Sequence, residues 1–413
     1  MTNTFKKLRK KFRRRKMMAE KAMLERKQST AARTGSYQSR LLRRRIDALK
    51  RVLTMTAIVV LAVLALVLYF QKRCYYDYKI LKTSEQEDVV STNYVEMNGK
   101  ILRYTPEGVS LVNRSLETVW SDIYEMQNPM ADVCDNRAVI ADRDGTSMRI
   151  YGEDGLEGSV TTSYSIVKAR ISQNGLVAAI LDGGADTWIN FYASDGSLIA
   201  ENQTKVDDPG FPMDVAVSDD GQIMMVAYQF VDGGDTASYV AFYNFGDVGQ
   251  NEDDRIVSGY NYEGVVIPQV QYLNDSRSVV LRDNGFTLYS GKQIPKETKT
   301  IEVEKEIVST FYDDDTIGMV FKNDSSENLY SMEVYSAEGK LKFRREFDVP
   351  YTTIRMSDGY IIMYNSSQVA VLTGNGTEKY NGTVEGTIND FFKIGWNRYL
   401  LVLDTGVNIM KFS

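Results

Sequence analysis

A thirteen-residue segment recurs in this sequence, and the recurrence limits the folds open to the chain more than any other feature. ARISQNGLVAAIL at 169–181 aligns without gaps on VAVSDDGQIMMVA at 215–227, and each copy has the pattern strand, turn, strand. Weaker copies begin near Val270, Phe311 and Ile354. Self-similarity with a period of about 20 to 50 residues is typical of repeat architectures, in which each unit packs against its neighbours.

A third strand in each unit ends at a tyrosine that is followed by a glycine-containing turn. These tyrosines are Tyr151, Tyr192, Tyr289 and Tyr335. Their spacing corresponds to units of about 40 to 50 residues, which is the length of one four-stranded propeller blade. Between them lie short runs of Val, Ile, Tyr and Phe, separated by Asp-Gly and Asn-Gly pairs that suit tight hairpins. The sequence therefore predicts an all-β fold, a β-propeller.

The units predict seven complete blades at 92–122, 127–163, 165–207, 211–261, 265–304, 306–349 and 351–384. Residues 387–413 supply only about three strands, and a propeller must close its ring to protect its strand edges. We expect the missing strand to come from 78–91, so that both ends of the propeller sequence close the ring. This predicts eight blades, with seven as the alternative if two weak units merge.

Residues 52–70 contain no charge, no Pro and no Gly, and as a helix they would extend about 28 Å, close to the thickness of a bilayer core. Basic residues are denser before this segment than after it, which predicts a cytoplasmic N-terminus. We expect an uncleaved single-pass anchor in the cell membrane. The predicted organisation is a basic cytoplasmic tail at 1–51, a transmembrane helix at 52–70, a linker at 71–77 and an extracellular propeller at 78–413.

The charge of −6 hides two opposed parts: residues 1–51 hold 19 Lys/Arg and 3 Asp/Glu, a net +16, so the remainder carries −22. Residues 5–27 are rich in helix formers, whereas 28–39 are small and polar and predict a flexible linker. Because a span follows the tail, we expect it to contact anionic lipid of the inner leaflet and no nucleic acid. The predicted lipid contacts are Lys6, Lys7, Arg9, Lys10, Lys11, Arg13, Arg14, Arg15 and Lys16.

The sequence has no histidine, which excludes Ser-His-Asp triads, Cys-His pairs and His-bound zinc. Its two cysteines, Cys74 and Cys134, are too few for a Cys-rich metal site. We therefore predict no catalytic residues, no bound metal and no cofactor, although Ca²⁺ remains an alternative at carboxylate loops.

Two Asp-Gly-Gly loops occupy equivalent places between the second and third strands of adjacent units. They consist of Asp182, Gly183, Gly184 and Asp186 in one loop and of Asp232, Gly233, Gly234 and Asp235 in the other. Their oxygen ligands could hold Ca²⁺ or bind a basic partner. The alternative is a pair of solvated hairpin loops. The many tyrosines pose a similar choice, between a sugar-binding face and the packing of blade interfaces.

The segment 108–120, GVSLVNRSLETVW, is similar to the repeat of quinoprotein-type propellers, in which a strand, a short turn and a Trp-ended strand recur. Residues 331–343 form a degenerate copy. The chain as a whole resembles a Firmicutes family of membrane-anchored propeller proteins with WD40-like blades, whose function is unknown. The resemblance implies an extracellular propeller behind one span, and it carries no catalytic residue with it.

These features favour a binding scaffold or sensor whose propeller engages an envelope protein or a cell-wall component. The alternative is a propeller enzyme, either a carboxylate-dependent glycan hydrolase or a quinone-type dehydrogenase. Convergent acidic side chains in the central channel would support the enzyme, whereas a filled channel would exclude catalysis there.

Overall fold

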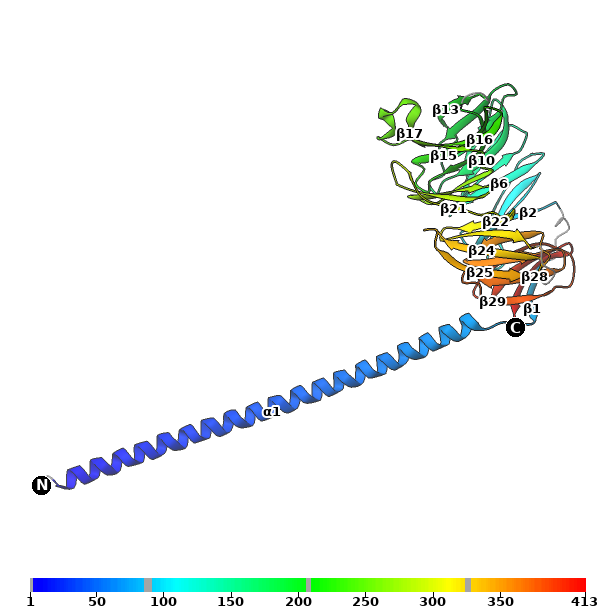
Figure 1. Cartoon of the computed structure of the whole chain (residues 1–413). Coiled ribbons are helices and arrows are strands. Elements are labelled where there is room, and N and C mark those ends of the chain that lie inside the picture. The colour runs from blue at the N-terminus through cyan, green and yellow to red at the C-terminus, as the bar shows by residue number, and fades with distance from the viewer. Residues whose placement is uncertain (1–2, 85–90, 206–208, 324–327) are drawn as a thin grey trace. The chain divides into compact units, whose positions relative to one another are not determined.

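The computed structural model describes residues 3–84, 91–205, 209–323 and 328–413. The chain divides into two compact units, Met1–Arg73 and Cys74–Ser413. The first unit consists of the helix α1 (Asn3–Lys72), and the second contains the strands (Figure 1).

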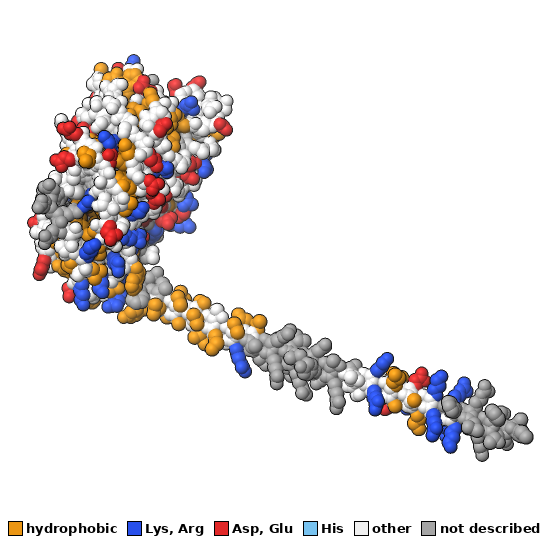
Figure 2. Space-filling model, turned by 180° about the vertical axis from the view of Figure 1, so that it is seen from behind, with side chains coloured by type: hydrophobic (Ala, Val, Ile, Leu, Met, Phe, Trp, Pro, Cys, Tyr) orange, Lys and Arg blue, Asp and Glu red, His pale blue; other side chains and the backbone are white. Residues whose placement is uncertain are grey.

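Within α1, the stretch Leu49–Leu66 is long and apolar enough to cross a membrane, with a mean hydropathy of 2.1 and none of it buried. It overlaps the predicted span at 52–70, and Figure 2 shows this part of the helix covered mostly by hydrophobic side chains. Among the predicted lipid contacts, the side chains of Lys10, Lys11 and 13–16 are exposed. The side chains of Lys6, Lys7 and Arg9 lie outside the described ones.

The prediction of a flexible linker at 28–39 was wrong, because α1 continues through it. The segment has no Pro and only one Gly, Gly35, whose cost in a helix is about 1 kcal/mol relative to Ala. Strong helix formers flank it on the N-terminal side. Since each added residue contributes a hydrogen bond once a helix has nucleated, one weak position does not end it.

The second unit is a propeller of eight four-stranded antiparallel sheets. Blade 1 contains β2 (Asn93–Met97), β3 (Lys100–Thr105), β4 (Gly108–Val112) and β5 (Thr118–Ile123). Blade 2 contains β6 (Pro129–Cys134), β7 (Arg137–Asp142), β8 (Ser147–Gly152) and β9 (Gly155–Thr161). Blade 3 contains β10 (Ser165–Ile171), β11 (Val177–Asp182), β12 (Thr187–Tyr192) and β13 (Leu198–Thr204). Blade 4 contains β14 (Phe211–Val217), β15 (Ile223–Asp232), β16 (Asp235–Asn244) and β17 (Ile256–Glu263).

The remaining blades repeat the pattern. Blade 5 contains β18 (Gln269–Asn274), β19 (Arg277–Arg282), β20 (Gly285–Ser290) and β21 (Lys296–Glu302). Blade 6 contains β22 (Ile307–Asp313), β23 (Thr316–Lys322), β24 (Tyr330–Ser336) and β25 (Leu341–Phe347). Blade 7 contains β26 (Thr353–Ser357), β27 (Tyr360–Tyr364), β28 (Gln368–Thr373) and β29 (Glu378–Thr383). Blade 8 contains β30 (Ile388–Gly395), β31 (Arg398–Leu403), β32 (Gly406–Phe412) and β1 (Tyr78–Ser84).

Blade 8 closes the ring with strands from both ends of the propeller sequence, as predicted. β1 pairs antiparallel with β32, with Tyr78 opposite Phe412, and the Ser413 amide donates to the Asp77 carbonyl at 2.8 Å. Phe412 is 1% exposed and lies between the rings of Tyr380 and Tyr399, at centroid distances of 4.2 and 4.3 Å. The prediction of eight blades is confirmed. Residues 85–90 of the predicted closing strand lie outside the described residues.

The repeated tyrosines pack between blades. Tyr151, Tyr192, Tyr289 and Tyr335 are all buried, at 6% exposure or less. The Trp-ended strand of blade 1 reaches the same layer, because the Trp120 ring stacks on Tyr151 at 5.2 Å and its Nε1 donates to the Glu153 carbonyl. An aromatic at this point therefore fixes one blade against the next.

Because the strands of each blade are antiparallel, the turns between them lie on two opposite faces of the propeller. Turns between first and second strands, and between third and fourth strands, lie on one face, where β1 begins and β32 ends. We call it the entry face. Turns between second and third strands lie on the opposite face, with the connections from blade to blade. The first strands contact one another around the central channel.

Candidate functional site

The two Asp-Gly-Gly loops lie on the opposite face, as hairpin tips of blades 3 and 4. In the first, the Gly184 amide donates to Oδ1 of Asp182 at 2.7 Å, and the Gly183 amide donates to the Asp186 carbonyl at 2.9 Å. In the second, Asp232 pairs with Asp235 across Gly233 and Gly234, both of which have positive φ.

Hairpin geometry therefore accounts for Gly233 and Gly234, since two-residue hairpins need positive φ. In the first loop, four residues separate the paired Asp182 and Thr187, and Gly184 has positive φ. Asp182, Asp232 and Asp235 are exposed. Among the described residues, no group of three or more Asp, Glu, His or Cys side chains could hold a metal ion.

A buried charge network occupies the central channel at blades 2 to 4. The guanidinium of Arg170 lies 2.8 Å from Oδ1 of Asp132 and 3.8 Å from Oδ1 of Asp214. Lys168 Nζ lies 2.6 Å from the same oxygen of Asp214, whose side chain is 0% exposed. Burial alone would lower the pKa of Arg170, but the two carboxylates raise it above its ordinary value. The positive and negative charges here neutralise one another.

Backbone amides complete this network. The Ile171 amide donates to Oδ2 of Asp132 at 2.8 Å, and the Val270 amide donates to Oδ2 of Asp214 at 2.9 Å. Each oxygen of the two carboxylates thus accepts from at least one charged or backbone donor. Both carboxylates therefore tie blades together across the channel wall.

Tyr312 of blade 6 extends the network across the channel. Its hydroxyl accepts from Nε2 of Gln269 at 2.8 Å and donates to Oε1 of Gln271 at 3.3 Å. Burial raises the pKa of Tyr312 to about 12, against the opposing effect of nearby Arg170. Paired charges and a tyrosine thus line the channel wall at this level.

Carboxylates gather above this network, where the channel opens on the entry face. Asp135, Asp219, Asp275 and Asp314 lie in the first turns of blades 2, 4, 5 and 6, and together we call them the acidic mouth. Burial, followed by the charges of Asp275 and Asp314, raises the pKa of Asp219 to about 6.

The pKa of Asp314 is also raised, by burial and then by three carboxylates that include Asp135 of blade 2. Asp135 thus acts on Asp314 of blade 6, and Asp314 acts in turn on Asp219 of blade 4. The turns that carry these side chains all lie on the entry face, around the same opening of the channel.

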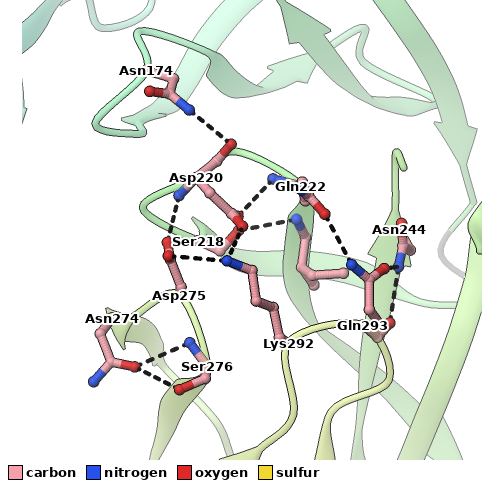
Figure 3. Close-up of polar contacts among 11 residues, drawn as sticks. Asn174, Ser218, Asp220, Gln222, Asn244, Asn274, Asp275, Ser276, Lys292 and Gln293 are labelled. Atoms are coloured by element: carbon pink, nitrogen blue, oxygen red, sulfur yellow. Dashed lines mark hydrogen bonds and ion pairs between the residues drawn. The ribbon is translucent and has the colours of Figure 1, made fainter. Parts of the chain in front are cut away.

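Lys292 fixes one side of the acidic mouth (Figure 3). Its Nζ lies 3.2 Å from Oδ2 of Asp220 and 3.3 Å from Oδ2 of Asp275. The Asp220 amide also donates to Oδ1 of Asp275 at 2.8 Å, and Asn174 Nδ2 donates to the Asp220 carbonyl at 3.1 Å. Figure 3 shows these contacts joining the turns of blades 3, 4 and 5. The mouth is therefore held open by a defined framework.

The two cysteines are both free thiols. Cys134 lies under the acidic mouth, with Sγ 3.8 Å from Oδ1 of Asp219. Burial and then the charge of Asp219 raise the pKa of Cys134 to about 12. Because the thiolate is the nucleophilic form, this cysteine is suited to packing and not to covalent chemistry.

Sequence reasoning did not find the acidic mouth. Its members are separated by tens of residues, and each looks like an ordinary turn residue in the sequence. The available signal was the position of the aspartates in the repeat, because all four fall in the turn between the first and second strands of their units.

Comparison with protein families assigns the chain. A model described as a family of unknown function (DUF5711) matches residues 71–412, more than half of the sequence. The chain belongs to the DUF5711 family. In this DUF5711 member, the matched range contains all eight blades. No curated protein matches the sequence.

Solved structures similar to this DUF5711 chain include BamB from Moraxella catarrhalis, at 13% identity and a TM-score of 0.48, covering 81% of this chain and 100% of that one. A eukaryotic initiation factor has 13% identity and a TM-score of 0.50, covering 81% and 87%. The Pan2 WD40 domain from Neurospora crassa has 11% identity and a TM-score of 0.40, covering 69% and 88%. At such identities the likeness concerns the fold alone.

Proposed function

We propose that this protein is a membrane-anchored, non-enzymatic scaffold whose extracytoplasmic propeller docks a cationic segment of an envelope protein on the acidic mouth. The observation that carries the proposal is the gathering of carboxylates at one opening, above a channel wall lined by paired charges. A rigid framework holds those carboxylates, so that little ordering is needed on binding. A surface of one charge sign also attracts an oppositely charged partner over distance.

The raised pKa of Asp219 would equally suit the general acid of a glycan hydrolase, and it supports that enzyme as the second candidate. Such an enzyme needs a second carboxylate that activates water or attacks the sugar. Asp275 is instead occupied by Lys292 and by the Asp220 amide. We therefore favour docking, and the two proposals separate on whether a bound substrate is cleaved.

The anchor in this proposal is the apolar stretch Leu49–Leu66, with the N-terminus in the cytoplasm. Basic residues near an anionic leaflet contribute about 1 kcal/mol each to membrane attraction. The tail around Lys10 to Lys16 therefore holds the cytoplasmic part of α1 at the inner surface, in a bacterial cell membrane of the kind that the Firmicutes resemblance implies.

In-cell crosslinking followed by pull-down of the whole chain tests the docking surface. The variant Asp219→Asn with Asp314→Asn should lose a crosslinked protein that wild type retains, and the loss should be reproduced by raised salt. The matched control is Asp232→Asn with Asp235→Asn, which removes two exposed carboxylates from the opposite face. Equal loss in both variants, or loss in neither, would overturn the proposal.

A further inference from the structure

A groove opens at the outer rim of the propeller, between blades 3 and 4, away from the acidic mouth. Its volume is about 490 Å³, within the range of about 300 to 1,000 Å³ typical of ligand sites. We call it the rim groove, and its lining consists of Asn202, Gln203, Pro209, Phe230, Tyr239, Tyr243, Asp254, Ile256 and Asn261. A separate, neighbouring hollow of about 210 Å³ shares Asn202, Tyr243 and Asp254 with it and is also lined by Glu201 and Arg255.

The shape of blade 4 creates this groove. β15 and β16 have ten residues each, against five to eight in the other strands, and they extend the blade. The connection from β16 to β17 adds two short 3₁₀ helices, η1 (Gly249–Asn251) and η2 (Asp253–Arg255). These elements build a wall that stands against β13 of blade 3, the strand that supplies Asn202 and Gln203.

A glycine makes room for one of the tyrosines that line the groove. Tyr239, Ala241 and Tyr243 alternate along the face of β16 that meets blade 3. Across the ladder, Asn261 pairs with Tyr239 and Gly259 pairs with Ala241. A Cβ at Gly259 would lie 2.1 Å from the Tyr239 hydroxyl. Because Gly259 has no side chain, the hydroxyl end of the Tyr239 ring can pack against its backbone.

The tyrosines are held in place before any ligand arrives. The ring of Tyr239 stacks on Tyr228 at a centroid distance of 6.2 Å, and the hydroxyls of Tyr228 and Tyr243 are 2.7 Å apart. Burial raises the pKa of Tyr243 to about 12, so this hydroxyl stays protonated and able to donate at neutral pH. Fixed aromatic surfaces lose little conformational entropy when they bind a ligand.

The chemistry of the lining identifies a class of ligand. Carboxamides both donate and accept hydrogen bonds, which suits hydroxyl groups, and aromatic rings provide an apolar surface with a polar tip. Among the residues that the structure describes, the lining of the rim groove has three carboxamides and three aromatics, one carboxylate in Asp254, and no Lys or Arg. We propose that the rim groove binds an uncharged saccharide chain, with pyranose rings stacked on Tyr239 or Phe230 and hydroxyls bonded to Asn202, Gln203 and Asn261.

This composition separates the rim groove from another rim cavity of the molecule. The hollow of about 330 Å³ between blades 6 and 7 is lined by charged groups that include Arg345 and Glu378, whose atoms are 2.6 Å apart. These two charged side chains are therefore already paired with each other. The same cavity also contains an Asn and a Gln, Asn381 and Gln368, which makes it a matched control.

The inference goes beyond docking at the acidic mouth and is tested independently. The whole chain in lipid nanodiscs, which avoid glycoside detergents, is titrated with uncharged tetrasaccharides of glucose and of N-acetylglucosamine by calorimetry. Wild type should bind at least one of them. Gln203→Ala with Asn261→Ala should weaken that binding at least tenfold, because two hydrogen-bonding side chains on the exposed wall are lost. Both residues are exposed, so the melting temperature should stay within about 1 °C.

The control variant Gln368→Ala with Asn381→Ala should bind as wild type does. Binding that is lost equally in the control, or that neither variant changes, would overturn the assignment. The assignment would also be overturned if wild type bound none of the tetrasaccharides, or if a peptide instead of a saccharide crosslinked to the rim groove. The Asp219→Asn, Asp314→Asn variant should keep saccharide binding, so failure at the mouth is distinct from failure at the groove.

Discussion

Replacing Phe412 by Ala tests whether blade 8 is the point at which the ring opens. Phe412 is 1% exposed and contacts two tyrosine rings, and truncation of such a buried phenylalanine costs about 3 to 5 kcal/mol. Unfolding entropy is about 2.1 cal/mol/K per residue, so a propeller of roughly 340 residues has about 0.7 kcal/mol/K. The apparent melting temperature should therefore fall by about 4 to 7 °C at a fixed scan rate.

The strand in which amide exchange speeds up distinguishes an opened ring from general damage to the core. In Phe412→Ala, amide exchange in β1 should speed up at least tenfold, because β32 holds this strand. Phe286→Ala is the matched control, since Phe286 is 0% exposed in blade 5 and packs on Tyr335. It should lower the melting temperature similarly and leave β1 exchange unchanged. A shift below about 1 °C in Phe412→Ala, or equal β1 exchange in both variants, would refute the reasoning.

Arg170→Met leaves Asp132 without its cation, while Asp214 keeps Lys168, and it should cost about 3 to 5 kcal/mol by chemical denaturation. Arg277→Ala, which breaks an exposed pair, should cost less than about 1 kcal/mol. The pKa of Asp219 is about 6 when folded and 3.8 ordinarily, so its contribution to stability falls as pH rises through that window, and Asp219→Asn should gain melting temperature relative to wild type at pH 7.5 but not at pH 4. Replacing all basic residues from Lys6 to Lys16 by Gln should leave membrane insertion intact but reduce binding of the isolated tail to anionic vesicles, and unchanged binding would contradict the lipid assignment. A reporter fused after Ser413 should be active outside the cytoplasm, and a cytoplasmic signal would overturn the proposed topology.

The propeller could be predicted because its information is local and repeated. The match of 169–181 with 215–227 marks the first two strands of blades 3 and 4, and Tyr192 ends the third strand of blade 3. Each predicted range covers the strands of one blade, apart from single or paired residues at the ends of β5 and β17. Closure by 78–84 followed from counting strands, since a ring with a missing strand leaves an open edge.

The sites depend on distant residues and could not be predicted in the same way. Asp135 and Asp314 meet only because ring closure places blade 2 within reach of blade 6. The rim groove depends on Gly259, which in the sequence looks like any glycine of a strand. The prediction of a flexible linker at 28–39 was wrong for a different reason. It rested on local composition, whereas a helix that has already nucleated continues through a short segment of weak helix formers.

The strand that closes the ring is also the one through which the chain leads to α1. A mechanical load applied along α1 reaches the propeller first at the buried Tyr75, whose amide donates to the Lys379 carbonyl, and then at Tyr78, the end of the β1–β32 ladder that pairs with Phe412. Tension there would detach β1 before it strained any other blade, and it would open the propeller between β32 and β2. The aromatic cluster around Phe412 thus sets the force that this molecule withstands when its two ends are pulled apart.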